Sequence, residues 1–174
     1  MSALDQLYQQ VILDHARERH GHGLREPTGA WATSRQVNPL CGDEVTVRVA
    51  VTEPDGEPVV ADVSWVGEGC SISQAATSTL HDLVVGRTVR AATDVVAQFR
   101  AMVRSRGSIV PDEEVLGDAA AFAGVGRHAN RVKCAMLGWT AFEDALQRAV
   151  AGLYAAAGPE PDRADHRTDQ GSAR

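Results

Sequence analysis

The alternating valines between residues 45 and 51 constrain the fold most strongly. Valine occupies every second position from Val45 to Val51, and a period of two is typical of a half-buried strand. The turn-forming residues 54–56 follow, and the β-branched segment 59–66 then predicts a return strand. We therefore expect an antiparallel hairpin, to which residues 32–37 would add a third strand.

The rest of the chain has helical periodicity. Apolar residues at positions 4, 7, 8, 11 and 12 form one stripe of an amphipathic helix, with Ser2 as its N-cap and Gly21 as its stop. Further helices are expected over 72–84, 93–104 and 128–153, with shorter helical pieces between 111 and 125. Strands come first and helices follow, without βαβ alternation. This order predicts an α+β fold, a small antiparallel sheet of about three strands with helices packed on one face.

Length and charge narrow the class of protein. The chain has 174 residues and a formal net charge of −6, so we expect one domain and no nucleic acid partner. Residues 155–174 contain no aromatic or β-branched aliphatic side chain. We therefore expect a domain over 1–153 and a disordered tail over 154–174. The absence of a long apolar run or a signal-peptide pattern predicts a cytoplasmic protein that does not bind a membrane.

The chain has three cysteines, Cys41, Cys70 and Cys134. An odd number in a cytoplasmic chain argues against a disulfide framework. The thiols are then either small buried side chains or metal ligands and nucleophiles, and their surroundings must decide between these alternatives.

The first two cysteines lie in loops that the hairpin brings to one end of the sheet. Cys41 stands two residues before Asp43, so in an extended segment both side chains would point to the same side. Cys70 follows a glycine-rich strand end and begins a helix, where free N–H groups and the helix dipole favour a thiolate. The chain leaves the Cys41 loop along one strand and returns along the next. We therefore expect Cys70 to lie close to Cys41.

The third cysteine lies in the last helix between cationic residues. Arg131 and Lys133 precede Cys134, and we expect these two charges to lower the pKa of its thiol. Three thiolates and the Asp43 carboxylate suit a tetrahedral Zn²⁺ ion better than Mg²⁺ or Ca²⁺. The residues therefore predict a metal site with three cysteines and one aspartate. The loop histidines, such as His20, have no linked acid in sequence and are expected to be exposed to solvent.

Four motifs together resemble a known family. They are LYQQVILDH, NPLCGDEV, GEGCSISQAA and RVKCAMLGW, and their order and spacing resemble the U-type iron–sulfur cluster assembly proteins, within them the SufU-like branch, over residues 2–153. In the related IscU-type scaffold proteins a histidine directly precedes the last cysteine, whereas here that position is Lys133. The segment 107–126 also resembles the insertion of the SufU-like branch. The resemblance implies a SufE/NifU-like fold.

The resemblance also implies a function. A protein of this branch would bind zinc through Cys41, Asp43, Cys70 and Cys134. It would accept persulfide sulfur on Cys41 from a PLP-dependent, SufS-like cysteine desulfurase, with Asp43 and Arg131 assisting. The sulfur would pass to a downstream SufBCD-like scaffold, so the protein would act as a zinc-dependent sulfurtransferase together with its partner rather than as a stand-alone enzyme. Two alternatives are a scaffold that assembles a transient Fe–S cluster on the same four residues and a purely structural zinc domain.

Overall fold

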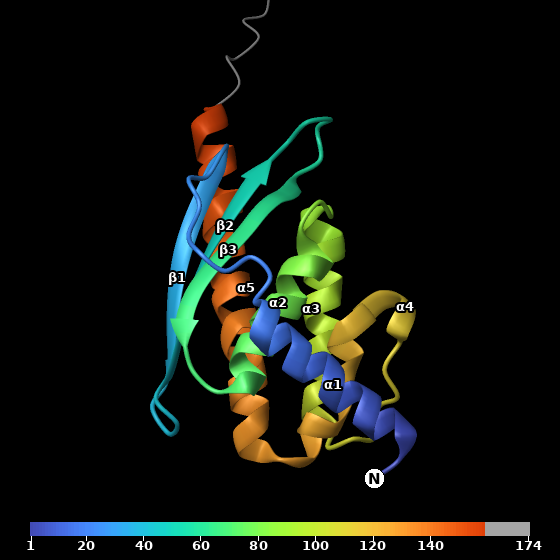
Figure 1. The fold of residues 1–174 in the computed structure, drawn as a ribbon. Helices are drawn as coiled ribbons and strands as arrows, with labels where there is room; N and C mark the ends of the chain where they lie inside the picture. The colour runs from blue at the N-terminus through green and yellow to red at the C-terminus, as the bar shows by residue number, and fades with distance from the viewer. Residues whose placement is uncertain (159–174) are drawn as a thin grey trace, which may run out of the picture.

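A three-stranded antiparallel sheet forms one layer of the molecule (Figure 1). The computed structural model describes residues 1–158, and its strands are β1 (Ala30–Asn38), β2 (Asp43–Thr52) and β3 (Val59–Glu68), in the order β1-β2-β3. The alternating valines of β2 are buried, as their period predicted. In the register, Asn38 faces Asp43 and Glu44 faces Glu68. The β1–β2 turn and the end of β3 therefore lie at the same end of the sheet.

The helices form the second layer and complete an α+β fold, as the sequence predicted. The long α5 (Ala129–Ala157) packs against β1 and β2, and α2 (Ser71–Val84) packs against both α5 and α1 (Ala3–Glu18). The remaining helical elements are α3 (Val89–Arg104), the short α4 (Glu113–Leu116) and the 3₁₀ segment η1 (Gly117–Arg127). Trp31, Arg35 and Val37 of β1 lie on the other face of the sheet and are exposed.

Aromatic packing fixes α5 against its neighbours. Trp139 of α5 is fully buried and stacks on Phe99 of α3, with ring centroids 3.8 Å apart. Its indole N–H donates to the Ala76 carbonyl of α2 at 3.0 Å. Gly138 allows α2 to come close, because a Cβ at this position would overlap the side chain of Thr77. The first turns of α5 are therefore held by contacts with both α2 and α3.

Several boundaries differ from those expected. The Ser2 N-cap of α1 is confirmed, but Leu4 and Leu7 are 51% and 58% exposed, so the predicted apolar stripe is only partly buried. The helix expected over 93–104 begins at Val89, because Thr88 caps it. Helix α5 continues to Ala157, beyond the expected helix end at residue 153. The rest of the predicted tail, residues 159–174, lies outside the described residues.

Over residues 1–158, none of the helices combines the length and the apolar character that crossing a membrane requires.

Candidate metal centre

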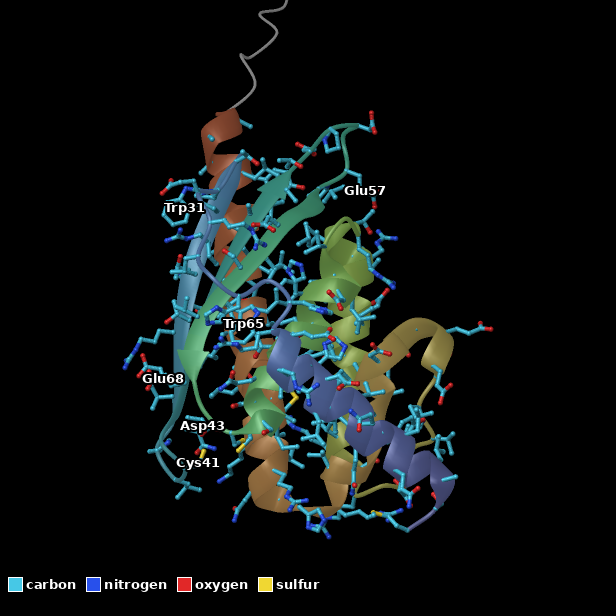
Figure 2. The ribbon with its side chains drawn as sticks, viewed as in Figure 1. Trp31, Cys41, Asp43, Glu57, Trp65 and Glu68 are labelled. Carbon is cyan, nitrogen blue, oxygen red and sulfur yellow. The ribbon has the colours of Figure 1, made fainter. Side chains whose placement is uncertain are left out.

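A tight turn between β1 and β2 presents the first cysteine. Cys41 lies in the turn 39–42, where Gly42 has a φ of 73° and donates its N–H to the Asn38 carbonyl at 2.8 Å. A positive φ of this kind favours glycine. The extended geometry expected for Cys41 and Asp43 is therefore wrong, because the chain turns at Gly42. The turn still leaves Cys41 exposed at the sheet edge (Figure 2).

Side chains from three parts of the chain meet at this end of the sheet. The Cys41 Sγ lies 3.7 Å from the Sγ of Cys134 on α5. One ligand atom each from Cys41, Asp43 and Cys134 lies within 4.8 Å of the other two. Two sulfur atoms bound to one tetrahedral zinc at about 2.3 Å lie roughly 3.8 Å apart. The observed sulfur–sulfur distance therefore fits thiolates that share one ion.

Cys70 lies beside this cluster at the start of α2, but its Sγ is not within 4.8 Å of all three other ligand atoms. Its backbone N–H donates to the Asp43 Oδ1 at 3.3 Å, and its Sγ lies 3.9 Å from the Ser73 hydroxyl. Gly69 makes this approach possible, because a Cβ there would lie 2.8 Å from the Asp43 Cγ. The hairpin thus brings Cys70 beside the Cys41 turn, as its topology predicted. The Cys70 side chain is exposed.

The Asp43 carboxylate has one satisfied and one unsatisfied oxygen. Asp43 is buried, and its Oδ2 has no hydrogen-bond partner within the described part of the chain. Burial raises the pKa of Asp43, but hydrogen bonds from Cys70, Ser73 and Cys41 outweigh it and hold the pKa below its usual range. A buried, ionised oxygen without a donor is energetically costly. A cation bound at this oxygen would remove that cost.

The protein environment raises the pKa of the Cys134 thiol, contrary to the sequence prediction. Burial is the main cause, and Cys41, Cys70 and Asp43 add to it by hydrogen bonding and by charge. Arg131 and Lys133 are exposed on the outer side of α5 and do not reverse the shift. A positive charge inside the cluster, such as a bound metal ion, would oppose this shift and favour the thiolate.

The donor set fits zinc. Three sulfur atoms and one carboxylate oxygen match the ligands and the number that a closed Zn²⁺ site uses. The Cys41–Cys134 contact and the unpartnered Asp43 oxygen both point to an ion at this place. Cys41, Asp43 and Cys134 would hold it, and Cys70 stands beside them as the predicted fourth donor.

Two residues near the site were not identified from sequence. The buried Asn38 directs its side-chain amide toward the Cys134 Sγ at 4.0 Å, while its Oδ1 accepts from the Leu40 N–H. The Asn-Pro pair that begins the turn is the signal that indicates this role. Ser73 donates to the Cys70 carbonyl at 3.0 Å and fixes the start of α2. Its position three residues after the cap is the corresponding signal.

The prediction that the loop histidines lack linked acids is wrong for His20. Its ring contacts the Asp82 carboxylate at 2.6 Å and the Glu18 carboxylate at 2.8 Å. These hydrogen bonds, that to Asp82 first, outweigh burial and raise the pKa of His20. Sequence separation concealed the pair, because 62 residues divide His20 from Asp82. His22 is exposed, as expected, and packs edge-on against Trp65.

Comparison with known proteins agrees with this geometry. Residues 7–135 match the model of the NifU-like N terminal domain, which spans most of the described fold. The chain belongs to this family. The finding confirms the resemblance that the four sequence motifs indicated, and it makes the chain a member of an iron–sulfur cluster assembly family.

Two curated relatives in this family carry different names. The chain is 31% identical to the iron–sulfur cluster assembly scaffold protein IscU of Streptococcus pyogenes, over 98% of this chain and 94% of the relative. It is 33% identical to the zinc-dependent sulfurtransferase SufU of Bacillus subtilis, over 86% of this chain and 95% of the relative. Sequence identity alone therefore leaves the choice between these two activities to the chemistry of the site.

A solved structure has the same fold. It is the putative iron–sulfur cluster assembly scaffold protein for the SUF system from Fervidobacterium islandicum, 30% identical, with a TM-score of 0.62. The match covers 81% of this chain and 97% of that structure. The sheet and helices that hold the three cysteines are thus a shared family framework.

Proposed function

We propose that this protein is a zinc-dependent sulfurtransferase in iron–sulfur cluster assembly. In this function Cys41 accepts persulfide sulfur from a SufS-like, PLP-dependent cysteine desulfurase and passes it to a SufBCD-like scaffold. The observation that carries the proposal is the exposed Cys41 thiol, 3.7 Å from the buried Cys134 thiol and grouped with Asp43. The similarity to the zinc-dependent sulfurtransferase of Bacillus subtilis supports it.

Cys41 is the best placed of the three thiols to react with a partner. Cys134 is buried in α5, and Cys70 caps α2, where its backbone is fixed by Asp43 and Ser73. Cys41 instead lies in an exposed turn beside Leu40, which is 70% exposed. A nucleophile that must meet another protein's side chain needs this accessibility.

The transfer is an exchange between a thiolate and a persulfide. The Cys41 thiolate attacks the outer sulfur of the partner's cysteine persulfide, and a new sulfur–sulfur bond forms as the old one breaks. The partner's cysteine leaves as a thiolate, and the persulfide proton stays on the transferred sulfur, so no oxidant or reductant is required. Bound zinc would supply the positive charge that keeps the clustered thiols ionised.

Arg131 assists through its charge. It lines a small pocket of about 140 Å³ together with Cys41 and Cys134. A guanidinium here would stabilise the Cys41 thiolate and the negative charge that passes to the partner's leaving sulfur. We expect Arg131→Ala to slow sulfur uptake without lowering zinc content, because Arg131 supplies none of the four donor atoms.

The decisive experiment compares two cysteine variants. Purified desulfurase and L-cysteine are mixed with each protein, and mass spectrometry locates the added sulfur atom. Cys41→Ser should take up none, whereas Cys70→Ser keeps the acceptor and should still be modified on Cys41, at a reduced rate. Zinc content is measured on both variants. A persulfide on Cys41→Ser would show that the acceptor is assigned wrongly.

A scaffold function is the second candidate, because one curated relative is named a cluster assembly scaffold. The same four donors could take a cluster as cargo, since Fe–S clusters also favour thiolate ligands. Protein purified without added iron decides between the two. Colourless protein with one zinc per chain supports the sulfurtransferase, and brown protein with iron and labile sulfide supports the scaffold.

A further inference from the structure

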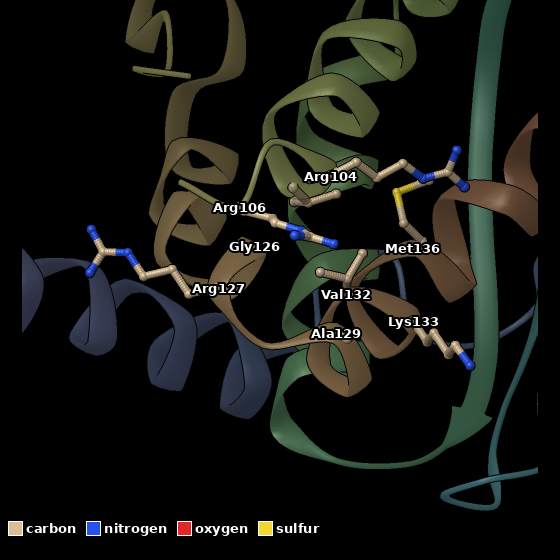
Figure 3. A pocket seen from close by; sticks show the side chains of 9 residues that line it. Arg104, Arg106, Gly126, Arg127, Ala129, Val132, Lys133 and Met136 are labelled. Carbon is tan, nitrogen blue, oxygen red and sulfur yellow. The ribbon is translucent and has the colours of Figure 1, made fainter. Parts of the chain in front are cut away.

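The structure has a basic groove, whose lining side chains are drawn in Figure 3. It has a volume of about 700 Å³ and is formed by the end of α3, the end of η1 and the first turns of α5. Its charged residues are Arg104, Arg106, Arg127 and Lys133, and Val132 and Met136 provide apolar surface. All four cationic side chains are exposed.

The cations of this groove form no direct ion pair within 4.0 Å over residues 1–158, although the charge of Arg127 acts on Asp5 at longer range. None of the described residues that line the groove is acidic. Arg25, Arg35 and Arg100, by contrast, each pair with a carboxylate. The chain as a whole carries a net charge of −6. A concentration of unpaired cations on an acidic protein favours an anionic partner that approaches from this side.

The groove and the reactive thiols are neighbours. Lys133 lines both the groove and the smaller pocket that contains Cys41 and Cys134. A molecule bound along the groove would therefore reach the edge of the metal centre. No other described pocket residue joins the two spaces.

We propose that this groove binds an acidic polypeptide segment of the protein that donates sulfur to Cys41. The inference rests on the proposed function and extends it to the partner surface. The groove is open, its cations are spread over three elements, and its floor is partly apolar, which suits a protein segment with carboxylates around an apolar side chain. A single small anion would instead favour convergent, partly enclosed donors.

The role of the cations is to guide and orient the partner. Charges at the rim of an interface chiefly raise the association rate and make it sensitive to salt. They do not take part in the exchange between sulfur atoms. Reversing them should therefore weaken binding, while transfer within the saturated complex continues at its normal rate.

The test uses charge reversal with a matched control. The double variant Arg104→Glu/Arg106→Glu changes the groove, and Arg90→Glu changes an exposed arginine near the start of α3, about 21 Å away along that helix. Binding to purified desulfurase is measured without L-cysteine at several salt concentrations, and sulfur transfer is measured with it. Zinc content and circular dichroism show whether each variant is folded.

The double variant should bind roughly tenfold more weakly, with a smaller dependence on salt. Its zinc content and its maximal transfer rate at saturation should match the wild type, and Arg90→Glu should bind normally. Unchanged affinity in the double variant, equal weakening in Arg90→Glu, or a wild type that does not bind the desulfurase would each overturn the groove assignment. Inorganic phosphate that binds at micromolar concentration and leaves desulfurase binding intact would overturn it too.

A different result would count against the proposed function alone. Wild-type protein that binds the desulfurase through the groove but gains no sulfur on Cys41 supports the docking surface and contradicts the sulfur transfer. The binding and transfer measurements therefore separate the two ideas.

Discussion

The sulfur atoms of Cys41 and Cys134 lie 3.7 Å apart, although 93 residues separate them in the chain. A disulfide bond needs about 2.05 Å between the sulfur atoms, so the two residues are thiols in contact. Cys134 is fixed in a buried helix, while Cys41 lies in an exposed turn. A movement of the turn alone would bring the atoms together.

Oxidation without zinc should link these two residues. After treatment with a strong chelator and then diamide, we expect a Cys41–Cys134 disulfide, since these two sulfur atoms lie only 3.7 Å apart. Peptide mapping by mass spectrometry identifies the bond. Cys70→Ser should form the same disulfide, and zinc-loaded protein should oxidise much more slowly. A predominant bond to Cys70 would contradict the observed arrangement.

Gly69→Ala should weaken metal binding without unfolding the protein. The new Cβ would lie 2.5 Å from the Ser73 hydroxyl and 2.8 Å from the Asp43 Cγ, so the carboxylate must move. Changes that disturb the residues supporting a metal ligand typically cost about 10–100-fold in affinity. Competition with a zinc chelator measures the loss. Gly124→Ala is the control, because its Cβ would meet nothing within 4 Å, and equal zinc affinity in both variants would refute the prediction.

Gly138→Ala should destabilise the contact between α2 and α5. Its Cβ would overlap Thr77, including the Thr77 Cβ at 2.9 Å, and overpacking of this kind typically costs about 1–3 kcal/mol. Gly152→Ala lies in the same helix with open space around it and should stabilise the protein by about 0.5–1 kcal/mol. Urea unfolding at equal zinc content compares them. Similar midpoints for the two variants would mean that the helices separate easily.

The hydrogen bonds of His20 to Asp82 and Glu18 should make the stability of the protein depend on pH. Hydrogen bonding to Asp82, with a contribution from Glu18, raises the pKa of His20 in the folded protein. A raised pKa means that the stabilisation is complete below the unfolded pKa of about 6.5 and is lost as the pH rises through the folded value. Asp82→Asn should therefore cost stability at pH 5.5 and little at pH 8.5. Urea unfolding at both pH values checks this, with the exposed Asp94→Asn as the control. An equal loss of stability at both pH values would contradict a role for the His20–Asp82 hydrogen bond.

Local patterns predicted the parts of this protein that depend on neighbours in sequence. The valine alternation predicted β2, and the hairpin that follows it correctly brought Cys70 beside the Cys41 turn. Ser2 was predicted as the cap of α1, and its capping contacts are with Asp5, only three residues away. In each case the deciding contact is short in sequence or fixed by strand pairing.

Properties set by the assembled surroundings were missed. The charges beside Cys134 suggested a low thiol pKa, but burial and the sulfur atoms of other elements raise it. The apolar spacing of α1 suggested that Leu4 is buried, but no described element covers its side of the helix. His20 appeared to lack an acid because Asp82 comes from a distant helix. These effects depend on which elements pack together, and single-sequence periodicity does not specify that.

The three cysteines of the candidate metal centre lie in three separate parts of the chain, and this also sets the order in which the centre can form. A chain that emerges from the ribosome begins with its N-terminal end, so the turn with Cys41 and the cap with Cys70 are synthesised before Cys134. Only when the first turns of α5 have docked against α2 and the sheet does the last sulfur arrive. A growing chain thus lacks the complete set of donors, and an ion could be held by all of them only after α5 has docked.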